Sequence, residues 1–222
     1  MVKVVQSWDD GLVSDIRLTE IFQRHQAKAA FCLNPGLHHD TRSFGWRHEN
    51  SEVWRLSIHE LYHVYHGFEI CSHSMTHPCL TDLSDDQLQW EIKTSKQVLE
   101  DIFHKPVHGF CYPFNAYNDF VKNIVRTSGY KWARGNQHYE GALPPADPFE
   151  FYPSCHFLDH DFWDKYDRLK ITNGVFFFWG HSYELISEGM WHDMEGKIRG
   201  ISLDPDAEWL FPDELSLFLA SR

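Results

Sequence analysis

Strand-like runs alternate with helix-like segments along nearly the whole chain, and this alternation constrains the fold more than any other feature. The strand-like runs are short and rich in β-branched and aromatic residues, and they cover residues 2–8, 27–33, 68–71, 107–112, 130–133, 151–156 and 175–179. Strands that alternate with helices form parallel sheets, because each helix carries the chain back to the same edge. The sequence therefore predicts an α/β protein with a largely parallel sheet.

Helical segments are predicted between these runs from apolar spacing and from capping signals. They cover residues 13–26, 58–66, 84–103, 117–128, 162–171, 191–199 and 212–220. Ser84 followed by Gln87 has the spacing of a capping box at a helix start. We expect a single catalytic domain over residues 1–222, with an inserted, irregular loop at 37–56 and a second loop at 136–149 that is rich in glycine and proline.

Charge and composition exclude several classes of function. The formal net charge is −12 and no cluster of Lys and Arg is present, which disfavours binding to nucleic acid or to an anionic membrane. No apolar stretch approaches the ~18 residues of a membrane span. The five cysteines include no C-x-x-C pair, which favours reduced thiols. We expect a cytoplasmic protein without membrane insertion, unless a leader peptide has been removed.

Polar residues that suit chemistry gather directly after the predicted strands. Asp9 and Asp10 end the first run, His73 and His77 follow the third, and His181 follows the most apolar run. In a β/α barrel the active site lies at the carboxyl ends of the strands. These distant segments are therefore expected to converge on one cleft.

The spacing of His73 and His77 permits metal binding, since imidazoles four residues apart meet on one face of a helical turn. The alternative is two surface histidines on a loop before Pro78. Asp9 and Asp10 repel one another unless a cation lies nearby, and one carboxylate with two imidazoles leaves open coordination positions for water. The second carboxylate then suits a general base, although an ordinary Asp-Asp-Gly turn is the simpler interpretation of that motif alone.

His181 has two interpretations as well. A histidine at the end of a buried strand suits a general acid. A lone histidine in this position is more often a capping or core residue.

Five short motifs give the chain a resemblance to the polysaccharide deacetylases, also called the NodB-homology domain or carbohydrate esterase family 4. They occur in the order found in that family and read SWDDG at 7–11, HSMTH at 73–77, FCYPFNAYN at 110–118, GYKWAR at 129–134 and WGH at 179–181. The resemblance spans residues 7–181. The first two motifs together are specific, and all five in sequence are unlike a chance match.

The resemblance implies a distorted (β/α) barrel of about seven parallel strands. It also implies a function, the removal of an N-acetyl or related acyl group from a carbohydrate by metal-activated water. In the family pattern Asp10, His73 and His77 hold the metal, Asp9 is the base and His181 is the acid. The oxyanion and the substrate lie against Tyr112, Pro113, Phe114 and Trp179, with the oxyanion at the Phe114 N–H.

Three departures from the family pattern affect the expected chemistry. Many members have Arg where this chain has Cys111, and that Arg pairs with the catalytic Asp. We hypothesise that Arg134 replaces it from the neighbouring strand. Asn115 stands at a glycine position but tolerates left-handed backbone torsions, and Trp179 stands where a Leu lines the acyl pocket. For the Asp that tunes the acid histidine, the candidates are Asp159 and Asp161.

Zinc is the expected metal, because two histidines and one aspartate with an open position suit it. Cobalt, nickel and manganese fit the same ligands. Two other functions stay open: an amidohydrolase for a small non-sugar amide, and a carbohydrate-binding relative without catalysis. The inserted loop, with its aromatic residues Phe44, Trp46 and Trp54, either covers the cleft and selects the N-acylated substrate or packs as a surface loop.

Overall fold

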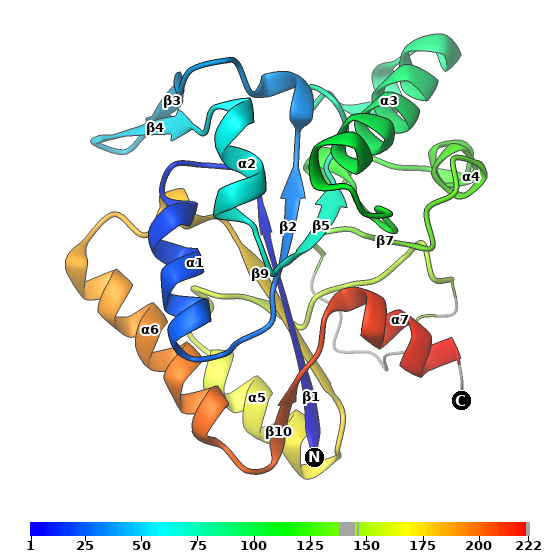
Figure 1. The fold of residues 1–222 in the computed structure, drawn as a ribbon. Helices are drawn as coiled ribbons and strands as arrows, with labels where there is room; N and C mark the ends of the chain where they lie inside the picture. Colours follow the sequence, from blue (N-terminus) through cyan, green and yellow to red (C-terminus); the bar gives the residue numbers. More distant parts are fainter. Residues whose placement is uncertain (138–144, 146, 221–222) are drawn as a thin grey trace.

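The computed structural model describes residues 1–137, 145 and 147–220, and it contains one curled parallel sheet surrounded by helices (Figure 1). Seven strands follow the order β7-β6-β5-β2-β1-β9-β8, and each pairing is parallel. The predicted α/β fold, a distorted barrel of about seven parallel strands, is confirmed. The strands are β1 (Val2–Asp9), β2 (Ala30–Leu33), β5 (Glu69–Ser72), β6 (Gly109–Cys111), β7 (Trp132–Arg134), β8 (Cys155–His156) and β9 (Val175–Gly180).

An eighth strand, β10 (Ala207–Trp209), joins this sheet and was not predicted from the sequence. It pairs with β1 through Val2–Val4, whereas β2 pairs with the same strand only through Ser7–Asp9. β10 thus occupies the part of β1 that β2 leaves unpaired. Its three residues show no clear strand pattern, because the position depends on the edge of β1.

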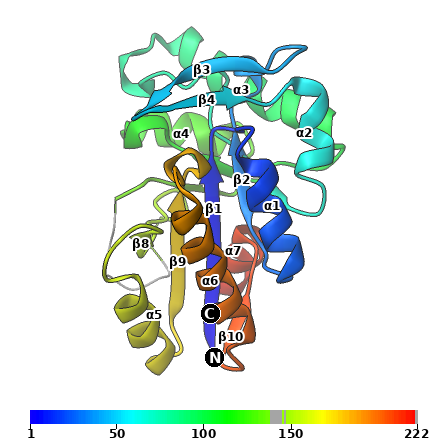
Figure 2. The same cartoon turned by 90° about the vertical axis from the view of Figure 1, so that its left-hand side faces the viewer.

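Helices connect the strands; the last of them packs against one end of the curl, and the others cover the outside of the sheet (Figures 1 and 2). They are α1 (Asp15–Arg24), α2 (Ile58–Val64), α3 (Asp85–Phe103), α4 (Asp119–Thr127), α5 (Phe162–Ile171), α6 (Glu188–Leu203) and α7 (Pro212–Ala220). The capping box predicted at Ser84 and Gln87 is present, with the Ser84 N–H and hydroxyl both donating to the Gln87 side chain. Of the predicted loop at 136–149, residues 138–144 and 146 lie outside the described residues.

Side chains alternate between the two faces of the curled sheet, as the two-residue period of a strand requires. Trp8 and Phe178 belong to the core between the sheet and its helices, while Val5 and Phe177 belong to a second cluster inside the curl. Because both faces are buried, the central strands are apolar throughout. Asp9 follows the same alternation and therefore points into the interior of the half-barrel.

The interior is closed at its amino-terminal end by α7. Leu215 packs in the inner cluster, and the Asp213 carboxylate accepts a hydrogen bond of 2.7 Å from the Trp132 indole on β7. The Asp213 N–H donates to the half-buried Glu69 carboxylate on β5 at 3.0 Å. With this end filled, the opposite, carboxyl end remains for the site.

Residues 43–55, within the segment predicted to be an irregular inserted loop, form an antiparallel hairpin. Its strands are β3 (Ser43–His48) and β4 (Ser51–Arg55), and their register is interrupted between Phe44 and Trp46. Figure 2 shows the hairpin lying across the carboxyl end of β1. The hairpin is fixed to that end, since Val13 N–H donates to the Trp54 carbonyl at 2.8 Å.

The buried Asp15 carboxylate links three segments at the carboxyl end. It accepts hydrogen bonds from the Leu12 N–H at 2.9 Å, from the Tyr65 hydroxyl at 2.6 Å and from the Ser182 hydroxyl. Burial raises the pKa of Asp15 to about 6, and the three hydrogen bonds limit that rise. Asp15 thereby joins the loop after β1, the end of α2 and the segment after β9.

Replacing Asp15 with alanine is expected to lower the free energy of unfolding by about 2–4 kcal/mol, because buried donors lose their acceptor. Urea unfolding at pH 8, where the carboxylate is ionised, measures the change. Asp101→Ala, at an exposed position on α3, is the control, with a change of about 0.5 kcal/mol or less. A similar small change in Asp15→Ala would show that the network contributes little.

Candidate active site

The carboxyl ends of the strands surround a cavity of about 460 Å³, which is within the range of small-molecule sites. Nine of the ten predicted site residues line it: Asp9, Asp10, His73, His77, Tyr112, Phe114, Arg134, Trp179 and His181. The tenth, Pro113, is buried beside them and does not line the cavity. Segments far apart in the sequence therefore converge as predicted.

The Asp10-Gly11 turn directs the Asp10 side chain toward the histidine pair. Both residues have positive φ angles, 84° and 72°, a conformation that glycine adopts readily. A Cβ atom at Gly11 would lie 2.6 Å from the His38 ring, so a larger residue is sterically excluded. The turn is held by the Asp10 N–H, which donates to the Cys32 carbonyl at 3.0 Å.

The histidine pair lies on an irregular loop, so the predicted helical turn is wrong. The segment after β5 bends at Ser74 and His77, whose φ angles are 65° and 58°. The Asn34 side-chain amide donates to the His73 carbonyl, and the His77 N–H donates to the Ser74 hydroxyl at 3.0 Å. These side-chain contacts replace the hydrogen bonds of a helix and bring the two rings to 4.6 Å between centroids.

Asp10, His73 and His77 form a donor group that could hold a metal ion, because their ligand atoms lie within 4.8 Å of one another. The His73 Nδ1 lies 2.9 Å from the Cys111 carbonyl. Donation of Nδ1–H to that oxygen leaves the Nε2 lone pair for a metal. Burial lowers the pKa of His73 to about 3 and also lowers that of His77. Both rings are therefore neutral at neutral pH, the form that binds metal.

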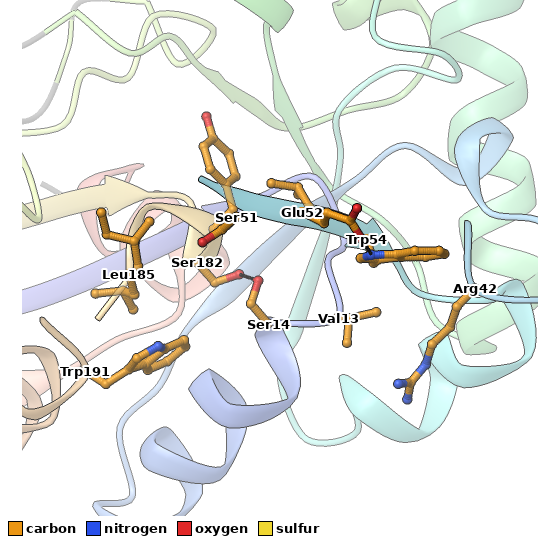
Figure 3. A pocket seen from close by; sticks show the side chains of 12 residues that line it. Val13, Ser14, Arg42, Ser51, Glu52, Trp54, Ser182, Leu185 and Trp191 are labelled. Carbon is orange, nitrogen blue, oxygen red and sulfur yellow. Dashed lines mark hydrogen bonds between the residues drawn. The ribbon is translucent and has the colours of Figure 1, made fainter. Parts of the chain in front are cut away.

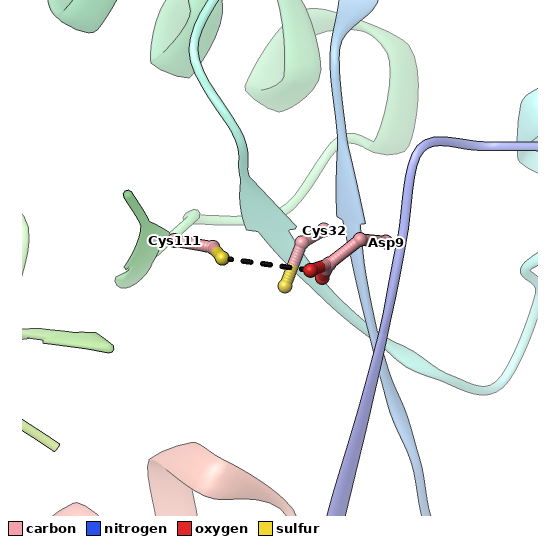
Figure 4. A group of neighbouring side chains, drawn as sticks. All are labelled: Asp9, Cys32 and Cys111. Carbon is pink, nitrogen blue, oxygen red and sulfur yellow. Dashed lines mark hydrogen bonds between the residues drawn. The ribbon is translucent and has the colours of Figure 1, made fainter. Parts of the chain in front are cut away.

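Asp9 lies beside this group, in contact with a buried arginine. The Arg134 guanidinium donates to one Asp9 carboxylate oxygen, and the Cys111 thiol donates to the other at 3.7 Å (Figure 4). Burial raises the pKa of Asp9 well above its usual range, and Arg134 opposes that rise. Cys111 and Arg134 are register partners on β6 and β7. The cation thus comes from the strand next to the position where the family pattern has arginine.

His181 is hydrogen-bonded to Glu184, and this contact was not predicted. The Glu184 carboxylate lies 3.2 Å from His181 Nδ1 and 3.0 Å from His156 Nε2, and it also accepts the His181 N–H at 3.0 Å. Burial lowers the pKa of His181, but the Glu184 contact and the charges of Asp9 and Asp10 outweigh burial, so the net shift is upward. The three-residue spacing of a capping box was the sequence signal that could have identified Glu184.

The two aspartates considered for this role lie elsewhere. Asp159 and Asp161 both form ion pairs with Lys165, at 3.3 Å and 3.0 Å. Asp159 also accepts the His156 N–H at 3.2 Å, a contact with the backbone of β8.

Aromatic side chains form much of the cavity wall. Phe114 adopts a φ of 55° and is 65% exposed, while its ring centroid lies 4.5 Å from that of His77. Tyr112 is buried and donates its hydroxyl to the Phe149 carbonyl at 3.1 Å. Trp179 lies 5.3 Å from His181 between ring centroids. Asn115 has a φ of 55°, as its tolerance for left-handed torsions allows.

Five further residues line the cavity: Trp46 and Arg55 of the hairpin, Cys111, Asn136, and Tyr183 after β9. Trp46 was considered from the sequence as part of the aromatic insert and Cys111 as a departure from the family pattern, whereas Arg55, Asn136 and Tyr183 were missed. Trp46 and Tyr183 pack edge to face, with 5.2 Å between ring centroids. Tyr183 also borders a second cavity of about 510 Å³, beside the Ser14–Ser182 hydrogen bond (Figure 3). For the hairpin residues that line the active-site cavity, the only sequence signal was the aromatic, insert-like character of residues 37–56.

The fold and the site correspond to those of a known family. The family model described as polysaccharide deacetylase matches residues 2–133, which include Asp9, Asp10 and the histidine pair. The chain belongs to the polysaccharide deacetylase family. Among curated proteins it is similar to YxkH of Bacillus subtilis (strain 168), named for the same family, with 28% identity over 90 residues. That match covers 40% of this chain and 30% of YxkH, less than a third of its length.

Solved structures share the fold at low sequence identity. A Mycobacterium smegmatis protein named as a polysaccharide deacetylase aligns with a TM-score of 0.74 and 12% identity, over 99% of this chain and 90% of its own. The peptidoglycan deacetylase PdaC from Bacillus subtilis gives 0.62 and 13%, over 100% and 93%. The Streptococcus pyogenes deacetylase PplD, solved with acetate, gives 0.55 and 21%, over 66% and 61%. In the described part of this chain, no helix is long and apolar enough to cross a membrane.

Replacing Glu184 with glutamine is expected to lower the pKa of His181, because the ring loses the carboxylate that favours its charged form. An NMR titration of the histidine ring signals, assigned with a His181→Gln variant, measures this. Glu188→Gln, whose carboxylate pairs with Arg17 on the surface, is expected to leave the His181 titration unchanged. An unaltered pKa in Glu184→Gln would contradict the role assigned to this contact.

Proposed function

We propose that this protein is a metal-dependent hydrolase that removes an acetyl or related acyl group from the nitrogen of a carbohydrate. One observation carries the proposal: a metal-type donor group, a buried carboxylate and a carboxylate-bound histidine line the same cavity. Amide hydrolysis needs an activated water, a base and an acid for the leaving amine. The aromatic wall suits the apolar faces of sugar rings.

The ligands of the metal in this proposal are Asp10, His73 and His77, and zinc is the metal that suits them best, with cobalt, nickel or manganese as alternatives. A divalent ion bound there supplies Lewis acidity, which lowers the pKa of water and polarises an acyl oxygen. The Asp10 carboxylate provides the negative charge, and the two neutral imidazoles complete the donor set.

Asp9 is the proposed general base, supported by its position beside the donor group and by its raised pKa. A carboxylate with a raised pKa is a stronger base than an ordinary aspartate. Arg134 holds Asp9 in place and favours its ionised form, against the effect of burial on the Asp9 pKa. In the proposed reaction Asp9 takes a proton from the attacking water.

His181 is the proposed general acid, and Glu184 positions it. With Nδ1 directed at Glu184, the Nε2–H of the protonated ring remains to be donated to the departing amine. The Phe114 N–H is proposed to stabilise the oxyanion, and Trp179 to form the wall against the acyl group. A bulky indole there favours a small acyl group such as acetyl.

Zinc reconstitution is expected to give about one ion per chain, measured by elemental analysis. The double variant His73→Ala, His77→Ala should lose both the metal and amine release from N-acetylated sugars, because two of three ligands are gone. The matched control is His63→Ala, His66→Ala, which alters two exposed histidines of α2 and the turn after it. A wild-type protein that takes up no divalent metal would overturn the proposed function.

Asp9→Asn is expected to lower kcat by about 10²–10⁴-fold while zinc binding persists. Arg134→Gln should move the acid limb of kcat/KM to higher pH. The base must be ionised, so activity falls as pH drops through the Asp9 pKa, and loss of the cation raises that pKa further.

Arg134→Lys keeps a positive charge and should shift the limb less. Arg126→Gln, at a surface ion pair with Asp147, should leave the profile as in the wild type. A pH profile that Arg134→Gln does not change would refute the replacement of the missing family arginine.

A further inference from the structure

The hairpin places one cation in the active-site cavity without an acidic partner. Arg55, the last residue of β4, lines the cavity. Among the residues that the structure describes, no carboxylate lies within 4.0 Å of its guanidinium nitrogens. The guanidinium is partly buried, and the Asp10 charge acts on it without forming an ion pair. Its desolvation is therefore only partly compensated in the free protein, and an anionic ligand would relieve that cost.

The other charged groups of the cavity already have partners. The Asp9 carboxylate pairs with Arg134, and Glu184 contacts both His181 and His156. Asp10 belongs to the metal-type donor group, with its carboxylate 4.0 Å from His77. A divalent ion at that group would more than neutralise Asp10. Within the described part of the chain, Arg55 then has no carboxylate to balance its charge, which is available to a ligand.

The guanidinium of Arg55 is held in a fixed orientation. It stacks on the Trp46 ring at 5.1 Å from the ring centroid, and its Nη1 donates to the Asp10 main-chain oxygen at 3.0 Å. That single bond leaves the other N–H groups of the fork available. A stacked, planar fork is suited to two parallel hydrogen bonds with a carboxylate or phosphate.

We propose that Arg55 selects an N-acylated sugar that carries an anionic group, a carboxylate or a phosphate, close to the scissile amide. The inference rests on the proposed function and names the substrate class of the same site. The anionic group must lie close to the scissile amide, because Arg55 contacts the main chain of Asp10 and Asp10 is one of the proposed metal ligands. A neutral N-acetyl sugar would leave the Arg55 fork unpaired.

Isothermal titration of three probes into the full chain, zinc-loaded and metal-free, tests the proposal. The probes are N-acetylmuramic acid for a carboxylate, N-acetylglucosamine 6-phosphate for a phosphate, and neutral N-acetylglucosamine. At least one anionic sugar should bind about tenfold or more tightly than the neutral one, as expected for charged hydrogen bonds. Whichever anionic sugar binds more tightly than the neutral sugar identifies the anion as a carboxylate or a phosphate. If neither anionic sugar binds more tightly, the proposal is wrong.

Variants of Arg55 separate recognition from a structural role. Arg55→Gln should remove the advantage of the anionic sugar, and Arg55→Lys should retain part of it through its point charge. Arg47→Gln, at an exposed ion pair with Glu52 on the same hairpin, should keep it. Equal weakening of all three sugars in both Arg55 variants would show that Arg55 only holds the Asp10 turn, and would overturn the proposal.

Kinetics and metal content distinguish this inference from the proposed function. The ratio of kcat/KM for the anionic over the neutral sugar should fall about tenfold in Arg55→Gln, while zinc content stays at the wild-type level. Absence of bound zinc and of amine release would refute the hydrolase itself. Turnover of neutral and anionic sugars at equal efficiency would refute only the role of Arg55.

Discussion

The contact between Asp9 and Arg134 is the constraint on which the geometry of the site depends. Their strands, β1 and β7, are four positions apart in the sheet order. In a flat sheet that separation would be about 19 Å, yet the two side chains form a buried ion pair. The pair is therefore possible only because the sheet curls. A buried charge pair is costly to form and more costly to break, which fixes the catalytic edge in one arrangement.

The residues inside the curl explain how such an arginine is accommodated. Ala30, Cys32, Cys71 and Cys111 are small and buried on the inner face, and they leave room for the Arg134 side chain. Cys111 and Arg134 are opposite one another on neighbouring strands. An arginine from either strand can therefore reach Asp9, but the interior holds one such side chain. Two of these thiols also contact the ion pair, because Cys111 donates to Asp9 at 3.7 Å and Cys32 accepts from Arg134 at 3.6 Å.

Local patterns in the sequence were sufficient for the α/β class, for most strands and for the capped start of α3. They also allowed the convergence of nine predicted site residues on one cavity to be predicted, because the carboxyl ends of parallel strands lie at the same edge of the sheet. The features that could not be predicted from the sequence depend on tertiary contacts. β10 exists because β1 has a free edge, the histidine pair converges through Asn34 and Ser74 instead of a helix, and Glu184 and Arg55 acquire their partners only in the folded chain.

The origin of each side chain in the cavity divides the site into two parts. The proposed acid, base and metal ligands lie at or just after the carboxyl ends of the sheet strands β1, β5 and β9. Trp46 and Arg55 come from the inserted hairpin, which is joined to the loop after β1 at Leu12 and Val13. An insertion can change without disturbing the core, so substrate selection is more easily altered there than at the strands. In this chain the hairpin adds an aromatic wall and a positive charge to the proposed reaction centre, and its Arg55 also contacts the Asp10 main chain.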